Sequence, residues 1–237
     1  MRLLGLETSG DTSSVALWAD GEVLAERVFA SHQTICQVLA TEILALLGTE
    51  TVGAGKLDGI AVSVGPASFT GLRVGVTTAK ALAYACRIPV VGVGTPLAWA
   101  AETRAEPGSL IVVLQPARRG KLYLTAFEQS LAAHPSTIHE TRVVDVSEAA
   151  SAALALAAGK HPVLTGNALG REPQLVTTLT GQAEVCVPAS DSPRASTIAY
   201  LGAPALGRAA PDSCFTLRPV YVLLSQAERA RGVDLGL

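Results

Sequence analysis

A series of two apolar runs with a helical pattern between them, over residues 60–93, constrains the fold more than any other feature of the sequence. Ile60–Val64 is continuously apolar, as in a strand that is buried on both faces. The run ends at Gly65-Pro66, a helical pattern follows over residues 70–86, and Pro89 precedes a second apolar run, Val90–Val93. This alternation predicts an α/β fold.

The residues before this series predict a three-stranded meander followed by a helix. Strand patterns cover residues 3–7, 15–19 and 23–29, and Asp20-Gly21 supplies the positive φ angles of a tight hairpin. Apolar side chains then recur at helical spacing from residue 35 to residue 46, between Ser31 as a cap and Gly48 as a stop. We therefore expect residues 1–105 to form one α/β unit.

Residues 106–237 carry weaker signals, and we expect them to form a second, looser unit. Strand patterns at 111–114 and 122–127 predict a hairpin, and an alanine-rich helix is expected over residues 147–158. Short strands follow at 163–165 and 183–187, and a helix is expected to start at Pro193.

Composition excludes several classes of protein. Of the 237 residues, 49% are hydrophobic and 16% charged, which predicts a buried core. The formal net charge of -2 and an aromatic content of 4% argue against a stand-alone nucleic-acid binder. No two of the four cysteines are spaced as a C-x-x-C motif, which argues against a zinc ribbon. No signal-peptide core and no apolar stretch of about 18 residues is found, so we expect a cytoplasmic protein without a membrane span.

The segment Gly65–Gly75 joins a buried strand to a helix through small residues. Backbone N–H groups at such a helix start can hold an anion, and Ser68 is placed to cap the helix. Small residues also recur every four positions along the helix, and such a ridge allows close approach either of a partner helix or of the chain's own sheet. These residues are Gly71, Gly75, Ala79 and Ala83.

These motifs resemble the TsaB (YeaZ) family, which takes part in making threonylcarbamoyladenosine in tRNA. The resemblance rests on Leu4–Ser9, Ser31-His32, Ala61–Ser63, Gly65–Gly75 and Pro89–Val93, and it continues more weakly in Ala117–Tyr123 and Pro219–Tyr221. It implies an actin-like ATPase (ASKHA) fold of two domains, the second degenerate. It also implies a non-catalytic subunit that supports a TsaD-type catalytic subunit, which transfers the threonylcarbamoyl group to the adenosine beside the anticodon.

The resemblance further implies a set of partners and site residues. A TsaE-type P-loop ATPase is expected to join the complex, tRNA to bind mainly through the complex, and the chain to form a homodimer when alone. No cofactor of its own is expected; a nucleotide at the interface with the catalytic partner is left open. Vestigial phosphate loops are expected at Thr8, Ser9, Gly65 and Ser68. The partner interface is expected at Ile35, Leu39, Gly71, Gly75, Ala79 and Ala83.

Several positions depart from the family pattern and bear on catalysis. The catalytic relatives place a metal-binding His-x-x-x-His pair where this chain has Thr95 and Trp99, so no metal site and no catalytic residue is expected. Ala67 replaces a glycine, Pro116 an aspartate, Leu223 an arginine and Thr34 an acidic residue. Two alternatives remain open. The first is an active actin-like small-molecule kinase or ATPase, which is disfavoured because Pro116 replaces an aspartate. The second is a peptidase, which is disfavoured because Thr95 and Trp99 replace the metal-binding histidines.

Overall fold

The computed structural model describes residues 1–31, 34–49, 57–118, 120–130, 134–159, 161–210 and 213–222. His32, Arg119 and Leu223, on which parts of the sequence-based prediction rest, lie outside these residues. Among the described residues, no helix is long and apolar enough to cross a membrane.

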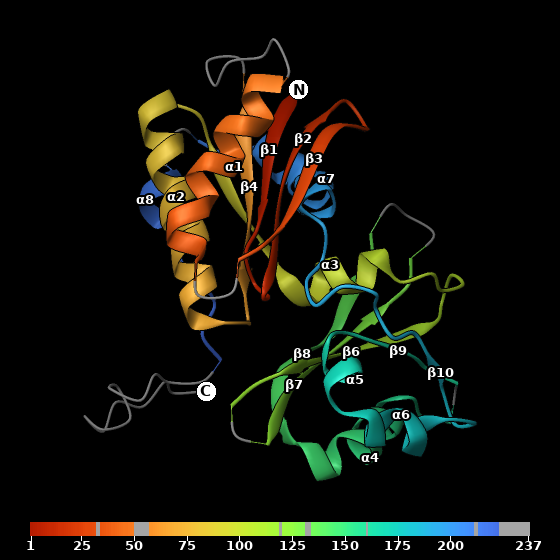
Figure 1. Cartoon of the computed structure of the whole chain (residues 1–237). Coiled ribbons are helices and arrows are strands. Elements are labelled where there is room, and N and C mark those ends of the chain that lie inside the picture. The colour runs from red at the N-terminus through yellow and green to blue at the C-terminus, as the bar shows by residue number, and fades with distance from the viewer. Residues whose placement is uncertain are drawn as a thin grey trace.

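The described residues form two five-stranded mixed sheets, one in each of two lobes (Figure 1). The first sheet has the order β3-β2-β1-β4-β5, and the second has the order β10-β9-β6-β7-β8. The strands of the first sheet are β1 (Arg2–Glu7), β2 (Thr12–Ala19), β3 (Glu22–Ala30), β4 (Gly59–Gly65) and β5 (Val90–Gly94). Those of the second are β6 (Leu110–Pro116), β7 (Lys121–Glu128), β8 (Ser136–Asp145), β9 (Val163–Thr165) and β10 (Glu184–Val185).

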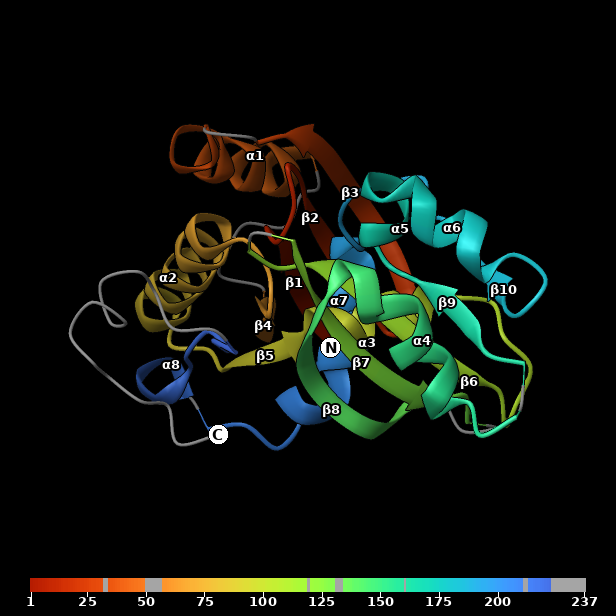
Figure 2. The same cartoon turned by 90° about the horizontal axis from the view of Figure 1, so that it is seen from below.

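Helices cover both faces of the first sheet (Figure 2). The described helices are α1 (Ile35–Thr49), α2 (Phe69–Cys86), α3 (Thr95–Glu102), α4 (Val146–Leu156), α5 (Ala168–Arg171), α6 (Pro173–Leu179), α7 (Ala195–Leu206) and α8 (Ser213–Thr216). Alternate side chains of β1 point to opposite faces, so Leu4 and Leu6 pack with α1 and α2, whereas Leu3 packs with α7. Burial on both faces explains why β4 is apolar throughout.

The second sheet is covered by α4 and α6 on one face and by α3 on the other. Val112 and Leu114 join the cluster that contains α4 and α6, while Ile111 and Val113 pack with Trp99 and Ala100 of α3. Helix α3 follows β5 of the first sheet and lies against the second, so it joins the two lobes.

The chain returns to the first lobe after residue 190, which differs from the predicted division. Residues 106–237 were expected to form the second unit, but α7 packs on β1, β2 and β4. The apolar face of α7, which includes Ile198 and Leu206, is buried there. Glu26 of β3 accepts hydrogen bonds from Arg194 and Ser196 at the start of α7. Burial of an apolar face, together with this carboxylate, accounts for the return.

Candidate functional site

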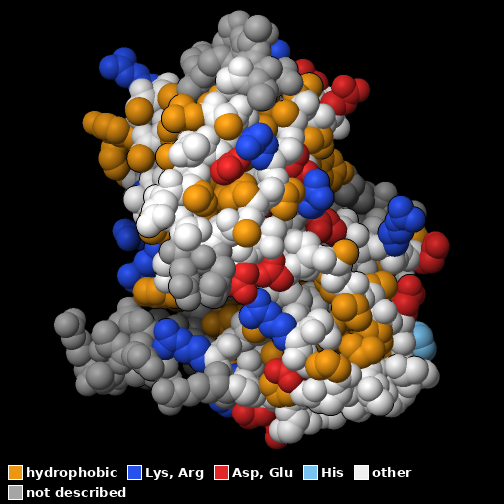
Figure 3. Space-filling view, viewed as in Figure 1, with side chains coloured by type: hydrophobic (Ala, Val, Ile, Leu, Met, Phe, Trp, Pro, Cys, Tyr) orange, Lys and Arg blue, Asp and Glu red, His pale blue; other side chains and the backbone are white. Residues whose placement is uncertain are grey.

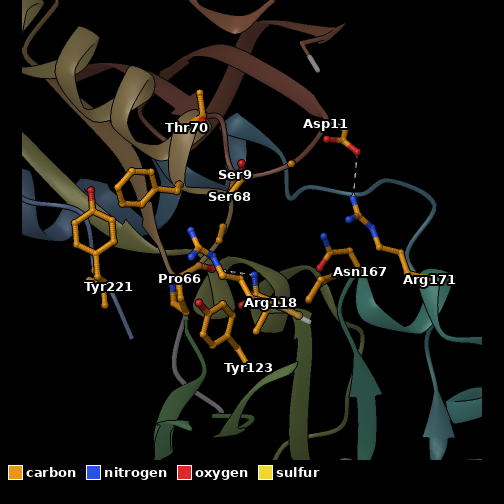
Figure 4. A pocket seen from close by; sticks show the side chains of 17 residues that line it. Ser9, Asp11, Pro66, Ser68, Thr70, Arg118, Tyr123, Asn167, Arg171 and Tyr221 are labelled. Carbon is orange, nitrogen blue, oxygen red and sulfur yellow. Dashed lines mark hydrogen bonds and ion pairs between the residues drawn. The ribbon is translucent and has the colours of Figure 1, made fainter. Parts of the chain in front are cut away.

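A cleft of about 360 Å³ lies between the two lobes (Figure 4). The first lobe contributes the turn after β1, the start of α2 and the C-terminal segment, while the second contributes the end of β6, β7 and α5. The residues that line it are Ser9, Gly10, Asp11, Pro66, Ala67, Ser68, Phe69, Thr70, Gln115, Pro116, Ala117, Arg118, Tyr123, Asn167, Arg171, Val220 and Tyr221.

The structure brings two of the four predicted phosphate-loop residues to this cleft. Ser9 and Ser68 line it, whereas Thr8 and Gly65 do not. The fully buried Thr8 hydroxyl donates a hydrogen bond to the carbonyl oxygen of Gly71 at 2.9 Å. Gly65 has a φ of 93°, a left-handed conformation that favours glycine, and it lies against Leu72. The side chain of Thr8 and the backbone of Gly65 therefore serve the packing of α2.

Ser68 occupies the N-cap position of α2, but its hydroxyl forms no capping hydrogen bond. The predicted capping role of that hydroxyl is wrong because the side chain lines the cleft instead. The first turn of α2 also contains no acidic residue. The positive end of the α2 dipole therefore has neither a side-chain cap nor a carboxylate of its own first turn.

An ion-pair network joins the lobes at one side of the cleft. Arg171 of the second lobe lies 3.3 Å from the Asp11 carboxylate and 3.6 Å from that of Asp191. Asp191 also accepts hydrogen bonds from the backbone N–H groups of Asp11 and Thr12. The charge of Arg171 is thus shared between two carboxylates.

Two side-chain amide groups near the cleft have unsatisfied oxygens. Gln115 is 3% exposed, and its Nε2 donates to the carbonyl oxygen of Pro66 in the other lobe. Its Oε1 has no hydrogen-bond partner among the described residues, and neither does Oδ1 of Asn167. Asn167 is oriented by its Nδ2, which donates to the carbonyl oxygen of Asp191. Buried polar atoms are usually paired, and each of these two oxygens can accept a further hydrogen bond.

Glu7 is fully buried at the end of β1, next to the turn that lines the cleft. Its Oε1 accepts a hydrogen bond from the Ser9 N–H at 2.5 Å, and its Oε2 has no partner among the described residues. Burial raises the pKa of Glu7 from 4.5 to about 7, although the hydrogen bonding of Ser9 to the carboxylate opposes the shift.

The predicted partner-interface residues lie inside the fold, so their assignment to the surface is corrected. A Cβ on Gly71 would lie 2.1 Å from the carbonyl oxygen of Thr8, and one on Gly75 would lie 2.1 Å from its Oγ1. The small-residue ridge therefore allows α2 to pack on the chain's own β1–β2 turn. The other four predicted residues are at most 5% exposed and belong to the core of the first lobe: Ile35, Leu39, Ala79 and Ala83.

The two positions compared with metal-binding histidines are buried in α3. Thr95 is 0% and Trp99 2% exposed, and Trp99 packs against the second sheet. In the described ranges, no group of three or more His, Cys, Asp or Glu side chains is arranged to hold a metal ion. Ala67 and Pro116, two of the departures from the family pattern, both line the cleft.

Sequence reasoning located only part of what closes the cleft. It allowed a second phosphate loop within residues 110–120 and a nucleotide-edge loop at residues 164–167, which contain Gln115 and Asn167, but it missed Arg171. Arg171 ends α5 and Asn167 directly precedes that helix, whereas Gln115 lies in β6. Only the Pro219–Tyr221 match pointed to the C-terminal segment, where Tyr221 packs on Phe69 with ring centroids 5.3 Å apart.

Two lobes built on five-stranded mixed sheets, with a cleft between them, define a protein of the actin-like ATPase fold. A family model described as "TsaD: tRNA N6-adenosine threonylcarbamoyltransferase" matches residues 20–205. The chain belongs to this family and, within it, to the TsaB (YeaZ) group. The predicted family and fold are thereby confirmed.

Two curated relatives carry the name "tRNA threonylcarbamoyladenosine biosynthesis protein TsaB". The protein from Bacillus subtilis (strain 168) is 29% identical over 231 residues, which cover 96% of both chains. The protein from Escherichia coli (strain K12) is 31% identical over 132 residues, and the match spans 54% of this chain and 56% of that protein.

Two solved structures show the fold. YeaZ from Pseudomonas aeruginosa superposes with a TM-score of 0.75 and 24% identity, covering 93% of this chain and 99% of that one. The ROK hexokinase from Thermus thermophilus gives a TM-score of 0.50 and 13% identity, covering 86% and 100%.

Proposed function

We propose that the chain is a non-catalytic subunit that is required for threonylcarbamoyl transfer to the adenosine beside the anticodon of tRNA, with a TsaD-type subunit as the catalyst. Membership of the TsaD family and the TsaB names of its relatives support a role in this biosynthesis. Relatives named tRNA N6-adenosine threonylcarbamoyltransferase, such as that of Geotalea uraniireducens (strain Rf4), share 32% identity with this chain over 109 residues.

The observation that carries the proposal is the burial of Thr95 and Trp99. A metal-binding pair one helical turn apart must present two donor atoms to one open site. Here, Trp99 instead fills the space between α3 and the second sheet, and neither side chain supplies a strong metal ligand. The fold of a catalytic relative is thus kept, while Trp99 packs α3 against the second sheet.

The outward faces of α1 and α2 are the surface that we assign to the catalytic partner. Leu44 of α1 is 70% exposed, and Tyr84 of α2 is 67% exposed. Figure 3 shows hydrophobic side chains on the side of the molecule that these two helices form. Apolar side chains at such exposure favour burial against another protein. The interface that we assign here therefore lies on the outward faces of α1 and α2, and not on the buried small-residue ridge predicted from the sequence.

The remaining parts of the proposal concern partners and place. A TsaE-type P-loop ATPase joins the complex, tRNA is bound mainly through the complex, and the same helix faces form a homodimer when the catalytic subunit is absent. The chain holds no cofactor of its own for the reaction, and a nucleotide can be held at the interface with the catalytic partner. The assembly acts in the cytoplasm.

Association with a purified TsaD-type subunit, measured by analytical ultracentrifugation, tests this proposal. Leu44→Glu and Tyr84→Glu should each weaken the complex, because a carboxylate in the interface loses its hydration. Ile138→Glu is the matched control, since Ile138 is 45% exposed on β8 of the other lobe. Unchanged association of both α1 and α2 variants would refute the assigned surface. Magnesium-dependent ATP turnover or chelator-sensitive proteolysis by the isolated chain would instead support the kinase or peptidase alternative.

A further inference from the structure

The cleft between the lobes carries binding groups that the proposed function does not use. Figure 4 shows the side chain of Arg118 extending from the turn after β6 toward Pro66 and Ser68. Arg118 is exposed, so its guanidinium is open to a ligand. Arg171, the other cation that lines the cleft, is already held by Asp11 and Asp191.

The start of α2 supplies a second feature that favours an anion. Its 18-residue helix has no acidic residue in the first turn and no side-chain cap, and the uncapped end lines the cleft through Ser68, Phe69 and Thr70. The N–H groups of a first helical turn have no partner within the helix. These groups, the Ser68 hydroxyl and the Arg118 guanidinium can all donate hydrogen bonds to an oxyanion.

Gln115 provides an independent sign of a ligand, because it offers a hydrogen-bond acceptor rather than a donor. Its side chain is 97% buried and lines the cleft, and its Oε1 has no donor among the described residues. The hydrogen bond from Nε2 to Pro66 fixes which end of the amide is the oxygen. Asn167 lines the same cleft with a second unpartnered amide oxygen. Both oxygens need an N–H or O–H donor.

We propose that the cleft binds a small molecule that combines one oxyanion, a carboxylate or a phosphate, with an N–H or O–H donor. The oxyanion lies against Arg118, Ser68 and the start of α2, and the donor meets Gln115 and Asn167. Because Ser68 belongs to the first lobe and the other three side chains to the second, the ligand ties the lobes together. Leu44 and Tyr84, which mark the assigned partner surface, do not line the cleft, so this site does not depend on the proposed function.

Paired probes, titrated into the full chain by ligand-observed NMR, test the proposal. The carboxylate pair is 3-hydroxybutyrate and butyrate, and the phosphate pair is glycerol 3-phosphate and methyl phosphate. In at least one pair, the member with hydroxyl groups should bind with a Kd of ~1 mM and about fivefold or more tightly than its partner, because only that member satisfies the buried amide oxygens. The pair that binds identifies the oxyanion.

Three variants complete the test. Arg118→Gln, at an exposed position, should weaken binding by about tenfold or more, because a hydrogen bond to a charged group is lost. Arg104→Gln, at another exposed arginine that does not line the cleft, should leave binding unchanged. Gln115→Leu should reduce the preference for the hydroxylated member, and a thermal melt checks that this variant folds.

Several results would overturn the proposal. These are the absence of binding by all four probes, equal affinity of wild type and Arg118→Gln, or tighter binding of Mg-ATP than of every probe. The last outcome would make the cleft a nucleotide site.

Discussion

Gly75→Ala tests directly whether the small-residue ridge of α2 serves the fold or a partner. The new Cβ would lie 2.1 Å from Oγ1 of Thr8 and 3.2 Å from its Cβ and Cγ2. Thr8 is fully buried, so it cannot rotate into solvent, and any rotation breaks its hydrogen bond to Gly71. The substitution therefore combines overpacking with the loss of a buried hydrogen bond.

The magnitude follows from three contributions. Overpacking costs about 1–3 kcal/mol, and an unsatisfied buried hydroxyl costs about 1–3 kcal/mol. The higher helix propensity of alanine than of glycine offsets about 1 kcal/mol of this loss in the free energy of unfolding. The free energy of unfolding should thus fall by about 1–5 kcal/mol, as measured by urea denaturation.

Two further variants make this result specific. Gly48→Ala in α1 is the matched control, because nothing lies within 4 Å of a Cβ at Gly48, and it should be neutral or stabilising by up to about 1 kcal/mol. Thr8→Ala combined with Gly75→Ala should recover part of the lost stability by removing the obstructing hydroxyl. Full stability of Gly75→Ala alone would refute the packing role of the ridge.

Three other predictions concern charges and the C-terminal segment. Because the pKa of Glu7 rises from 4.5 unfolded to about 7 folded, its contribution to stability is fully present below pH 4.5 and is lost as the pH rises through 7, by about 3 kcal/mol. Glu7→Gln should therefore gain stability relative to wild type between pH 5 and 8, and a difference that does not change with pH would contradict this. Glu26→Ala removes the acceptor for Arg194 and Ser196, so it should lower the free energy of unfolding by about 2 kcal/mol and speed hydrogen exchange at α7. Unchanged exchange at α7 would show that Glu26 does not hold this helix on the first sheet. Arg73→Ala removes the guanidinium that lies 3.7 Å from the Phe69 ring and donates a hydrogen bond to Tyr221, so proteolysis near residue 217 should accelerate. Equal cleavage rates of variant and wild type would show that Arg73 does not hold the C-terminal segment in place.

The first lobe could be predicted from the sequence because its elements have strong local signals. The apolar run of β4 and the helical pattern after Gly65-Pro66 located β4 and α2 to within a residue or two. Strand β8 was missed since most of its residues are exposed and it carries no clear alternation. Helix α3 was missed because it has only eight residues and starts directly after β5.

The candidate site could be predicted only in part because its residues meet through tertiary structure. A spacing of four residues shows that Gly71 and Gly75 share one helix face, but it does not show what that face contacts. The contact is Thr8, more than 60 residues earlier in the chain. The pairing of Arg171 with Asp11 likewise joins positions 160 residues apart.

The central claim is that this chain supports a reaction that it does not catalyse. Its most direct test is mass spectrometry of the tRNA nucleosides after unmodified tRNA has been incubated with threonylcarbamoyl-adenylate and ATP. With the TsaD-type and TsaE-type proteins present, threonylcarbamoyladenosine should form only when this chain is added, and this chain without the TsaD-type protein should form none. Two results would contradict the account: modification of tRNA by this chain without the TsaD-type protein, or an equal yield when this chain is left out.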